Sequence, residues 1–244
     1  MIRTGTTMRL DRLLARLDVS SRSSCRELLR AGRVKVNGEA KSDPAFAVPE
    51  GAEVTLDGKR LDTRLTRHLI MNKPAGVLTA KEDRFQQTVM DLLPKVYATL
   101  ECMPVGRLDR DTTGLLLLTT DGDLAHRLIS PARHVDKVYE ARVDGTLTDG
   151  DVAAFAAGIP LKDFTALPAR LEILAPDRGR VTVQEGKYHQ VKRMFGAVGK
   201  PVLALRRVSF GPLKLDSALS EGEFRELDQE EAAALYAAAG MNHE

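Results

Sequence analysis

Residues 106–119 of the chain read GRLDRDTTGLLLLT, a charged loop followed directly by four leucines. A short run of apolar residues between a glycine and a threonine is typical of a buried strand. Two carboxylates, Asp109 and Asp111, stand among Arg107 and Arg110 immediately before that strand. A strand anchored in the core would hold such a loop rigidly, so the loop is the first candidate for a functional site.

The segments around this strand mix strands and helices without alternating regularly. A second core begins with HLIMNKPAGV at 68–77. Strands are predicted from apolar and β-branched runs at 115–120, 137–143, 169–174, 180–184 and 201–210. Helices are predicted from amphipathic runs at 124–130, 151–158 and 187–198. Since strands outnumber helices, we expect an α+β domain with a mixed, mostly antiparallel sheet rather than a doubly wound one.

The first part of the chain has a different pattern. Apolar residues recur at one-turn spacing within 8–18 and again within 20–32, which predicts two short helices. Ser24 and Glu27 have the spacing of a capping box for the second helix. Short strands at 34–38 and 52–58 end in Asn-Gly and Asp-Gly turns. We therefore expect a small α/β domain over 8–57, a polar linker over 58–67 and a larger domain over 68–238.

The formal net charge of +2 conceals an uneven distribution. Residues 1–67 carry 14 basic and 9 acidic side chains, whereas residues 216–244 carry 1 basic and 8 acidic ones. We interpret the acidic segment 222–236 as a solvated helix face. Within the basic part, the second helix carries an arginine at every fourth position, which places Arg22, Arg26 and Arg30 on one side. Such a row repels itself, so it favours an anionic partner such as a nucleic-acid backbone.

Composition and motifs exclude several classes of protein. No stretch approaches the roughly 20 apolar residues that cross a bilayer, and residues 1–10 lack the features of a secretory signal. Cys25 and Cys102 form no CxxC motif, which fits small buried residues in a reducing cytosol. Residues 199–201, GKP, lack the serine or threonine of a phosphate-binding loop. The histidines have no zinc-site spacing and no GxSxG elbow is present.

A metal site built on aspartates is an alternative for the charged loop. Asp109 and Asp111 form one DxD pair, and Asp121 and Asp123 form a second. The first pair does not fit a calcium-binding loop, because Thr120 occupies the position that requires a bidentate glutamate. A two-metal site made of both pairs stays open, although Asp121-Gly122-Asp123 is more typical of a turn into a helix. Apart from such a metal site, the chemistry that these exclusions leave open for the loop is that of a single carboxylate in a polar, basic environment.

Several segments together resemble the RNA pseudouridine synthases, in their RsuA branch. GRLDRDTTGLLLLTTDG resembles the active-site motif of that family. Four other segments agree in the same order: the stretch from Met8 to Gly38, which resembles the S4 RNA-binding domain, NKPAG at 72–76, KVY at 137–139, and EGKYHQVKRMF at 185–195. The resemblance covers nearly the entire chain. It implies an S4-type domain followed by a catalytic domain of the pseudouridine synthase fold.

The resemblance also implies roles for individual residues. Asp109 is implied as the catalytic carboxylate, which must be ionised to attack the base or the sugar or to take a ribose proton. Lys192 stands where the family has an arginine or lysine that pairs with the catalytic aspartate. Tyr139 matches the aromatic residue that stacks on the flipped uracil, and Arg107 matches a residue that contacts the RNA. Asp111 is expected to brace the loop instead.

The implied reaction is the conversion of uridine to pseudouridine in ribosomal RNA, without a metal or other cofactor. The segments KYHQVKRM and LDSALSEGEFREL resemble the enzyme that acts on 16S rRNA, at a site of the position-516 type. Two alternatives stay open: an enzyme of the same family that modifies 23S rRNA, and an inactive RNA-binding or ribosome-assembly module. We expect a cytoplasmic monomer whose partner is small-subunit rRNA, naked or in a partly assembled particle, and no membrane.

Overall fold

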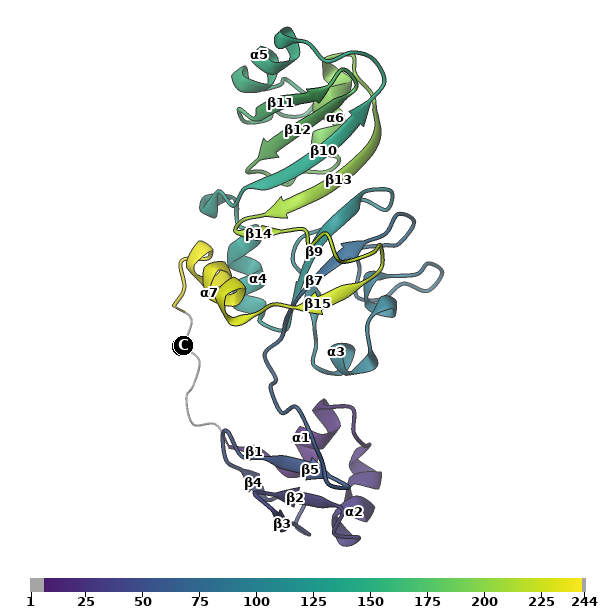
Figure 1. The fold of residues 1–244 in the computed structure, drawn as a ribbon, viewed down its shortest axis with the longest axis vertical. Helices are drawn as coiled ribbons and strands as arrows, with labels where there is room; N and C mark the ends of the chain where they lie inside the picture. The colour runs from purple at the N-terminus through teal and green to yellow at the C-terminus, as the bar shows by residue number, and fades with distance from the viewer. Residues whose placement is uncertain (1–6, 243–244) are drawn as a thin grey trace. The chain divides into compact units, whose positions relative to one another are not determined.

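A computed structural model describes residues 7–242 of the chain, and for Arg22 and Ser23 it describes the backbone alone. The chain divides into two compact units, each with its own hydrophobic core (Figure 1). The first unit comprises Met1–Thr66 and Pro94–Cys102. The second comprises Arg67–Leu93 and Met103–Glu244. A short segment from the middle of the sequence therefore belongs to the N-terminal unit.

The first unit packs three short helices with small sheets. Its elements are β1 (Met8–Arg9), α1 (Leu10–Arg16), α2 (Arg22–Arg30), β2 (Val34–Val36), β3 (Glu39–Ala40), β4 (Ala47–Val48), β5 (Val54–Leu56), β6 (Lys59–Arg60) and α3 (Lys95–Thr99). Leu10, Leu14, Cys25, Leu29 and Val54 are among its buried core residues. The two helices and the two strands predicted for this part of the chain are confirmed.

Two details of this unit differ in position from the sequence prediction. The N-cap of α2 is Ser21, whose hydroxyl accepts a hydrogen bond from the backbone amide of Ser24 at 3.2 Å. The predicted capping box of Ser24 and Glu27 is therefore wrong, because the helix begins one turn earlier and Ser24 already lies inside it. Strand β6 pairs with β5, so two residues of the range expected to form a linker add a strand to the small sheet.

A nine-stranded sheet organises the second unit. Its strands are β7 (His68–Lys73), β8 (Met103–Pro104), β9 (Thr113–Thr119), β10 (Lys137–Val143), β11 (Arg170–Ala175), β12 (Arg178–Val183), β13 (Val202–Phe210), β14 (Leu213–Lys214) and β15 (Phe224–Glu226). The order is β11-β12-β10-β13-β9-β7-β15, with β8 on β9 and β14 on β13. Of the pairs in this sheet, β9 with β13 is parallel and the rest are antiparallel. The predicted α+β class is confirmed.

Helices cover this sheet (Figure 1). They are α4 (Gly122–Ile129), α5 (Asp149–Ala157), α6 (Gln190–Ala197) and α7 (Gln229–Ala238), with one-turn 3-10 helices at Val89–Leu92 and Pro131–Arg133. Leu124 and Leu128 of α4 and Leu235 of α7 lie in one core cluster with Leu115 and Leu117 of β9. Among the described residues, no helix is long and apolar enough to cross a membrane.

The strand that follows the charged loop, β9, lies inside the sheet between β13 and β7. Leu115, Leu116, Leu117 and Leu118 are all fully buried, as their apolar run predicts. Strand β9 enters the sheet at Gly114, where a Cβ atom would overlap the backbone carbonyl of Arg207 on β13. Arg207 is itself buried and donates from Nε to the carbonyl oxygen of Leu115 at 2.7 Å. Glycine is therefore required where the loop meets the parallel pair.

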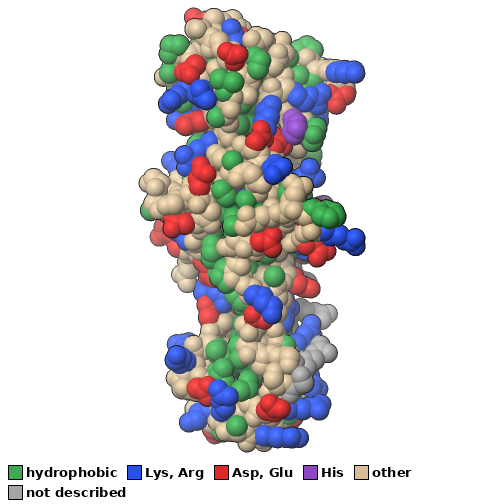
Figure 2. Space-filling model, turned by 90° about the vertical axis from the view of Figure 1, so that its right-hand side faces the viewer, with side chains coloured by type: hydrophobic (Ala, Val, Ile, Leu, Met, Phe, Trp, Pro, Cys, Tyr) green, Lys and Arg blue, Asp and Glu red, His purple; other side chains and the backbone are tan. Residues whose placement is uncertain are grey.

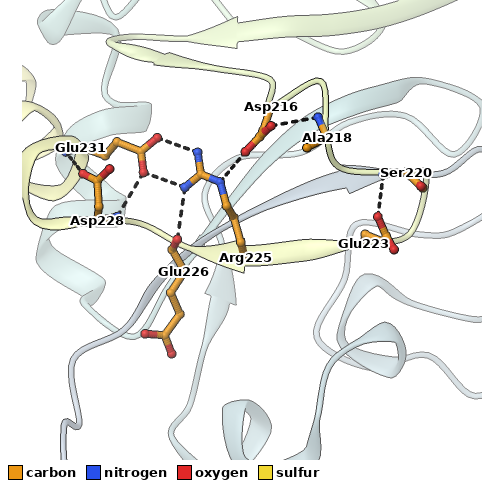
Figure 3. Close-up of polar contacts among 8 residues, drawn as sticks. All are labelled: Asp216, Ala218, Ser220, Glu223, Arg225, Glu226, Asp228 and Glu231. Carbon is orange, nitrogen blue, oxygen red and sulfur yellow. Dashed lines mark hydrogen bonds and ion pairs between the residues drawn. The ribbon is translucent and has the colours of Figure 1, made fainter.

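The acidic end of the chain is more than a solvated helix. Phe224–Glu226 forms β15 and pairs with β7, so the helical interpretation of 222–236 is wrong for these residues. Helix α7 begins only after Asp228, its N-cap. Arg225 lies between Asp216 and Glu231 and donates to both carboxylates, with N–O distances of 2.7 Å (Figure 3). This ion-pair cluster holds the final strand and helix together.

Candidate active site

The charged loop is held in place by the segment that follows β7. The backbone amide of Gly76 donates to the Arg110 carbonyl at 2.8 Å, and Arg110 Nε donates back to the Gly76 carbonyl at 3.0 Å. Thr79 Oγ1 donates to the carbonyl of Leu108 at 2.8 Å. The NKPAG segment is thus a structural brace for the loop that carries Asp109, a role that its sequence alone does not reveal.

Lys73 is the buried centre of that brace. Its ammonium group donates to the carbonyl oxygens of Pro74 at 2.9 Å, Arg110 at 3.3 Å and Thr112 at 3.1 Å. All three donors of the ammonium group are therefore satisfied by backbone. Burial lowers the pKa of Lys73 to about 8, against the opposing field of Asp111 and Asp109. The sequence analysis assigned no role to this residue, because only the fold brings its side chain under the loop.

Lys192 of α6 bridges the two carboxylates of the loop. Its Nζ lies 3.1 Å from Asp109 Oδ2 and 2.5 Å from Asp111 Oδ1. Burial by itself would lower the pKa of Lys192, but the hydrogen bonds to Asp111 and Asp109 raise it above its ordinary value. The hydrogen bond from Lys192 lowers the pKa of Asp111. The predicted pair of Lys192 with Asp109 is present, and Asp111 joins it as a second acceptor.

His189 is a further neighbour of Asp109 that the sequence analysis left without a role. Its Nε2 lies 3.5 Å from Asp109 Oδ1, and its ring stacks on that of Tyr188 with centroids 3.8 Å apart. His189 has left-handed backbone angles, with φ 49°, and immediately precedes the first residue of α6. That turn directs His189 and Lys192 toward the same carboxylate. His189 lies within EGKYHQVKRMF, one of the segments that carry the family resemblance.

A pocket opens beside Asp109. It is lined by Arg107 and Asp109 from the loop, Tyr139 from β10, Lys187 and His189 from the turn before α6, and Gln190, the first residue of α6. Tyr139 is only 9% exposed and Asp109 is partly buried, whereas the Arg107 side chain is exposed. The structure therefore brings together four residues selected from the sequence: Arg107, Asp109, Tyr139 and Lys192. A planar group entering this pocket would meet an aromatic ring and a carboxylate held beside an ammonium group.

Gln190 and Glu185 stabilise the wall of the pocket. Gln190 is buried and donates from Nε2 to Glu185 Oε2 at 2.9 Å, while its own Oε1 accepts from the Lys187 amide at 3.1 Å. Glu185 also accepts from the Leu167 amide at 2.9 Å. These bonds fix the turn that precedes α6, so His189 and Lys192 approach Asp109 from a rigid support.

The second DxD pair does not join this site. Asp121 is the N-cap of α4: its Oδ1 accepts from the Leu124 amide at 3.0 Å, and its Oδ2 accepts from Tyr236 Oη at 2.7 Å. The two pairs lie at opposite ends of β9, whose seven residues separate them. A two-metal site that requires both pairs is therefore incompatible with the fold.

The basic face predicted for the first unit is only partly described. Arg26 and Arg30 on α2 have exposed side chains, and the Arg22 side chain lies outside the described part of the structure. Arg33, which follows the helix, forms an ion pair with Asp57. Figure 2 shows Lys and Arg side chains, in blue, scattered over this unit among acidic and hydrophobic ones. The surface is compatible with an anionic partner.

Comparison with protein families decides the identity of the second unit. A family model described as RNA pseudouridylate synthase matches residues 67–197, more than half of the chain. The chain belongs to this family. A model of the S4 domain matches residues 8–54, within the first unit. The RsuA-type resemblance of the sequence is confirmed, and the chain is an RNA pseudouridine synthase.

Individual relatives cover almost the whole length of this pseudouridine synthase. An uncharacterized RNA pseudouridine synthase of Bacillus subtilis, YtzG, is 45% identical over 92% of this chain and 96% of its own length. Ribosomal small subunit pseudouridine synthase A of Escherichia coli K12 is 39% identical over 93% of this chain and 100% of its own. A crystal structure of a pseudouridylate synthase matches with a TM-score of 0.67 and 35% identity, over 94% of this chain and all of the other.

Proposed function

We propose that this enzyme isomerises a uridine of small-subunit ribosomal RNA and that Asp109 is its catalytic carboxylate. The observation that carries the proposal is the position of Asp109 in a pocket with Tyr139, within 3.1 Å of the Lys192 ammonium group. A nearby cation favours the ionised form of a carboxyl group, which any of the three routes open to Asp109 requires. Relatives named small-subunit enzymes support the choice of RNA.

The reaction assigns a task to each group in the pocket. The N1–C1′ bond of uridine breaks, the base turns, and a C5–C1′ bond forms while the C5 proton leaves and N1 gains a proton. Because a stacked base cannot reach Asp109, the nucleotide must be flipped out at a cost of a few kcal/mol. Tyr139 offers a ring for the flipped uracil, at about 1–3 kcal/mol for such a contact. Arg107 is exposed at the mouth of the pocket, where it would contact the RNA.

The first unit contributes affinity in this proposal. Arg22, Arg26 and Arg30 would contact the rRNA backbone, with a strong salt dependence as the consequence. The enzyme would act in the cytoplasm as a monomer, on naked rRNA or on a partly assembled subunit. Light scattering of the purified protein tests the oligomeric state. Comparing turnover on a transcript with turnover on a partly assembled particle tests the form of the substrate.

Release of tritium from rRNA labelled at C5 of uridine tests the proposed activity. Wild-type protein should release label from small-subunit rRNA, and Asp109→Asn should release none while still binding the RNA. Label released from large-subunit rRNA alone would contradict the proposed target. A wild-type protein that binds rRNA without releasing label would instead be an assembly module. Mapping pseudouridines in both rRNAs of a deletion strain identifies the modified position.

A further inference from the structure

A groove adjoins the catalytic loop at Asp111. It follows β13, and we name it the β13 groove. Its charged lining consists of Asp111, Glu140, Arg142, Arg178, Lys192 and Arg206. Four of these side chains are basic and two are acidic, so the groove is positively charged. Lys192 also contacts Asp109, so the groove begins at the proposed catalytic carboxylate.

The strand register explains where the positive charge comes from. Arg142 on β10 and Arg178 on β12 are directly opposite each other in the antiparallel pair. Like charges at opposed positions destabilise a sheet, so this pair is unfavourable in the isolated protein. Arg206 on β13 lies opposite Glu140 on β10, in the neighbouring row of the same face. An anion lying across the two rows would relieve the repulsion.

Both acidic side chains of the groove already have cationic partners. Glu140 accepts from Arg180 at 2.8 Å, and Asp111 accepts from Lys192 at 2.5 Å. Arg142, Arg178 and Arg206 are exposed, and in the described part of the chain none of these three forms an ion pair. Three guanidinium groups are therefore available on one surface.

The groove is open because β13 has a free edge there. Strand β9 pairs with β13 only at Arg206 and Arg207, so residues 202–205 have no partner on that side. Leu203, which is 54% exposed, and Leu174, which is 42% exposed, lie on the same groove. A peptide could add a strand to this edge, but an array of arginines favours phosphates, which guanidinium groups bind in bidentate geometry.

We propose that the β13 groove binds phosphates of the substrate RNA next to the target nucleotide, through Arg142, Arg178 and Arg206. The inference rests on the proposed function, because the RNA is placed by its flipped nucleotide in the Asp109 pocket. Phosphodiesters join that nucleotide to its neighbours, and the groove adjoins the pocket because Lys192 lines the groove and contacts Asp109. Leu203 and Leu174 provide apolar surface for riboses or bases.

The test compares a groove variant with a variant that loses the same charge elsewhere. The groove variant combines Arg142→Gln with Arg178→Gln, and the control combines Arg127→Gln with Lys214→Gln, two exposed residues outside the groove. The probe is a small-subunit rRNA transcript. Affinity is measured at several salt concentrations, and KM and kcat are measured by tritium release.

For the groove variant we expect KM about tenfold higher near 0.1 M salt, a salt slope smaller by about two, and an unchanged kcat. The control should behave as wild type, and Arg142→Lys with Arg178→Lys should recover most of the affinity. Unchanged KM and salt slope would overturn the proposal. A loss of kcat without a change in KM would also overturn it. A defect seen only with a partly assembled particle would overturn it as well, because it would indicate that the groove binds a protein partner.

Failure of the proposed target gives a different result. Wild-type protein would then release label from large-subunit rRNA instead of small-subunit rRNA. The same comparison of KM and salt slope on that RNA decides whether the groove binds phosphates. An Asp109→Asn protein, which keeps the groove intact, should bind either transcript with the salt slope of wild type.

Discussion

In each of two clusters in the second unit, one basic side chain bridges two carboxylates, but the surroundings of the two clusters differ. Lys192 bridges Asp109 and Asp111, and Arg225 bridges Asp216 and Glu231. In the second cluster, the guanidinium group binds Glu231 through two parallel hydrogen bonds and no lining residue of the Asp109 pocket takes part. In the first, a point charge on a flexible stem leaves Asp109 facing a pocket.

The comparison shows that an ion pair by itself does not identify a catalytic group. The Arg225 guanidinium group donates hydrogen bonds to Asp216 and Glu231 at once, and these bonds hold β15 against α7. The Lys192 ammonium group is shared between two carboxylates and contacts Asp109 through Oδ2, while Asp109 still lines the pocket. The experiments below should therefore separate catalysis at the Lys192 cluster from stability at the Arg225 cluster.

The largest effect is expected from removing the charge of Asp109. Asp109→Asn should lower kcat by about 10³-fold or more, because the proposed reactive group is lost. Asp111→Asn should lower it far less, since Asp111 only shares Lys192. Single-turnover pseudouridine formation measures both variants. Equal losses in the two variants would show that the carboxylates act as a pair.

Lys192→Met should have the next largest effect. Without the ammonium group, Asp109 and Asp111 repel each other, and the hydrogen bond from Lys192 that lowers the pKa of Asp111 in the wild type is lost. We expect kcat to fall by about 10²-fold and the acidic limb of its pH profile to move to higher pH. Lys192→Arg is the conservative control and should retain the wild-type profile. An unchanged pH profile in Lys192→Met would contradict the proposed role of the cation.

Arg225→Met should affect stability instead of catalysis. Loss of the partly buried guanidinium group leaves Asp216 and Glu231 without their cation, at a cost of about 1–2 kcal/mol in the free energy of unfolding. Urea denaturation measures this, and kcat per folded molecule should stay at the wild-type value. In the wild type, Arg225 lowers the pKa of Glu231, so this stability is present near neutral pH and is lost on acidification. The variant should lose less stability on acidification.

The smallest effect concerns the lysine below the catalytic loop. Burial lowers the pKa of Lys73 to about 8, so the unfolded chain binds more protons than the native protein above that pH. The free energy of unfolding should therefore rise with pH, by about 1 kcal/mol between pH 8 and 9. Lys73→Met should lack this rise while losing stability at every pH. Urea denaturation of both proteins at the two pH values measures the difference.

Sequence patterns predicted those parts of the site that local chemistry dictates. The buried leucines of β9 and the loop before them agree with the predictions. The pair of Lys192 with Asp109, which only the family resemblance implied, is present in the structure. His189 and Lys73 received no role, although both lie in segments singled out from the sequence. Lone histidines and lysines are ordinary surface residues in most contexts, so neither carries a signal until the fold places it beside Asp109 or beneath the loop.

The acidic end of the chain shows the opposite kind of limit. Its composition predicted a solvated helix, yet Phe224–Glu226 pairs with β7 and Arg225 draws two distant carboxylates together. These residues form a strand because they pair with β7, which is far away in the sequence, and the β-propensity of the segment itself does not predict such a pairing.

The sequence by itself determined the α+β class, the family, and the loop that carries Asp109. These follow from periodicity and from motifs of adjacent residues, which act over short distances along the chain. Only the tertiary structure decided that His189 lies beside Asp109, how Lys73 supports the loop, and that Arg142 faces Arg178. Such contacts arise from strand register and helix packing, which join residues far apart in the chain.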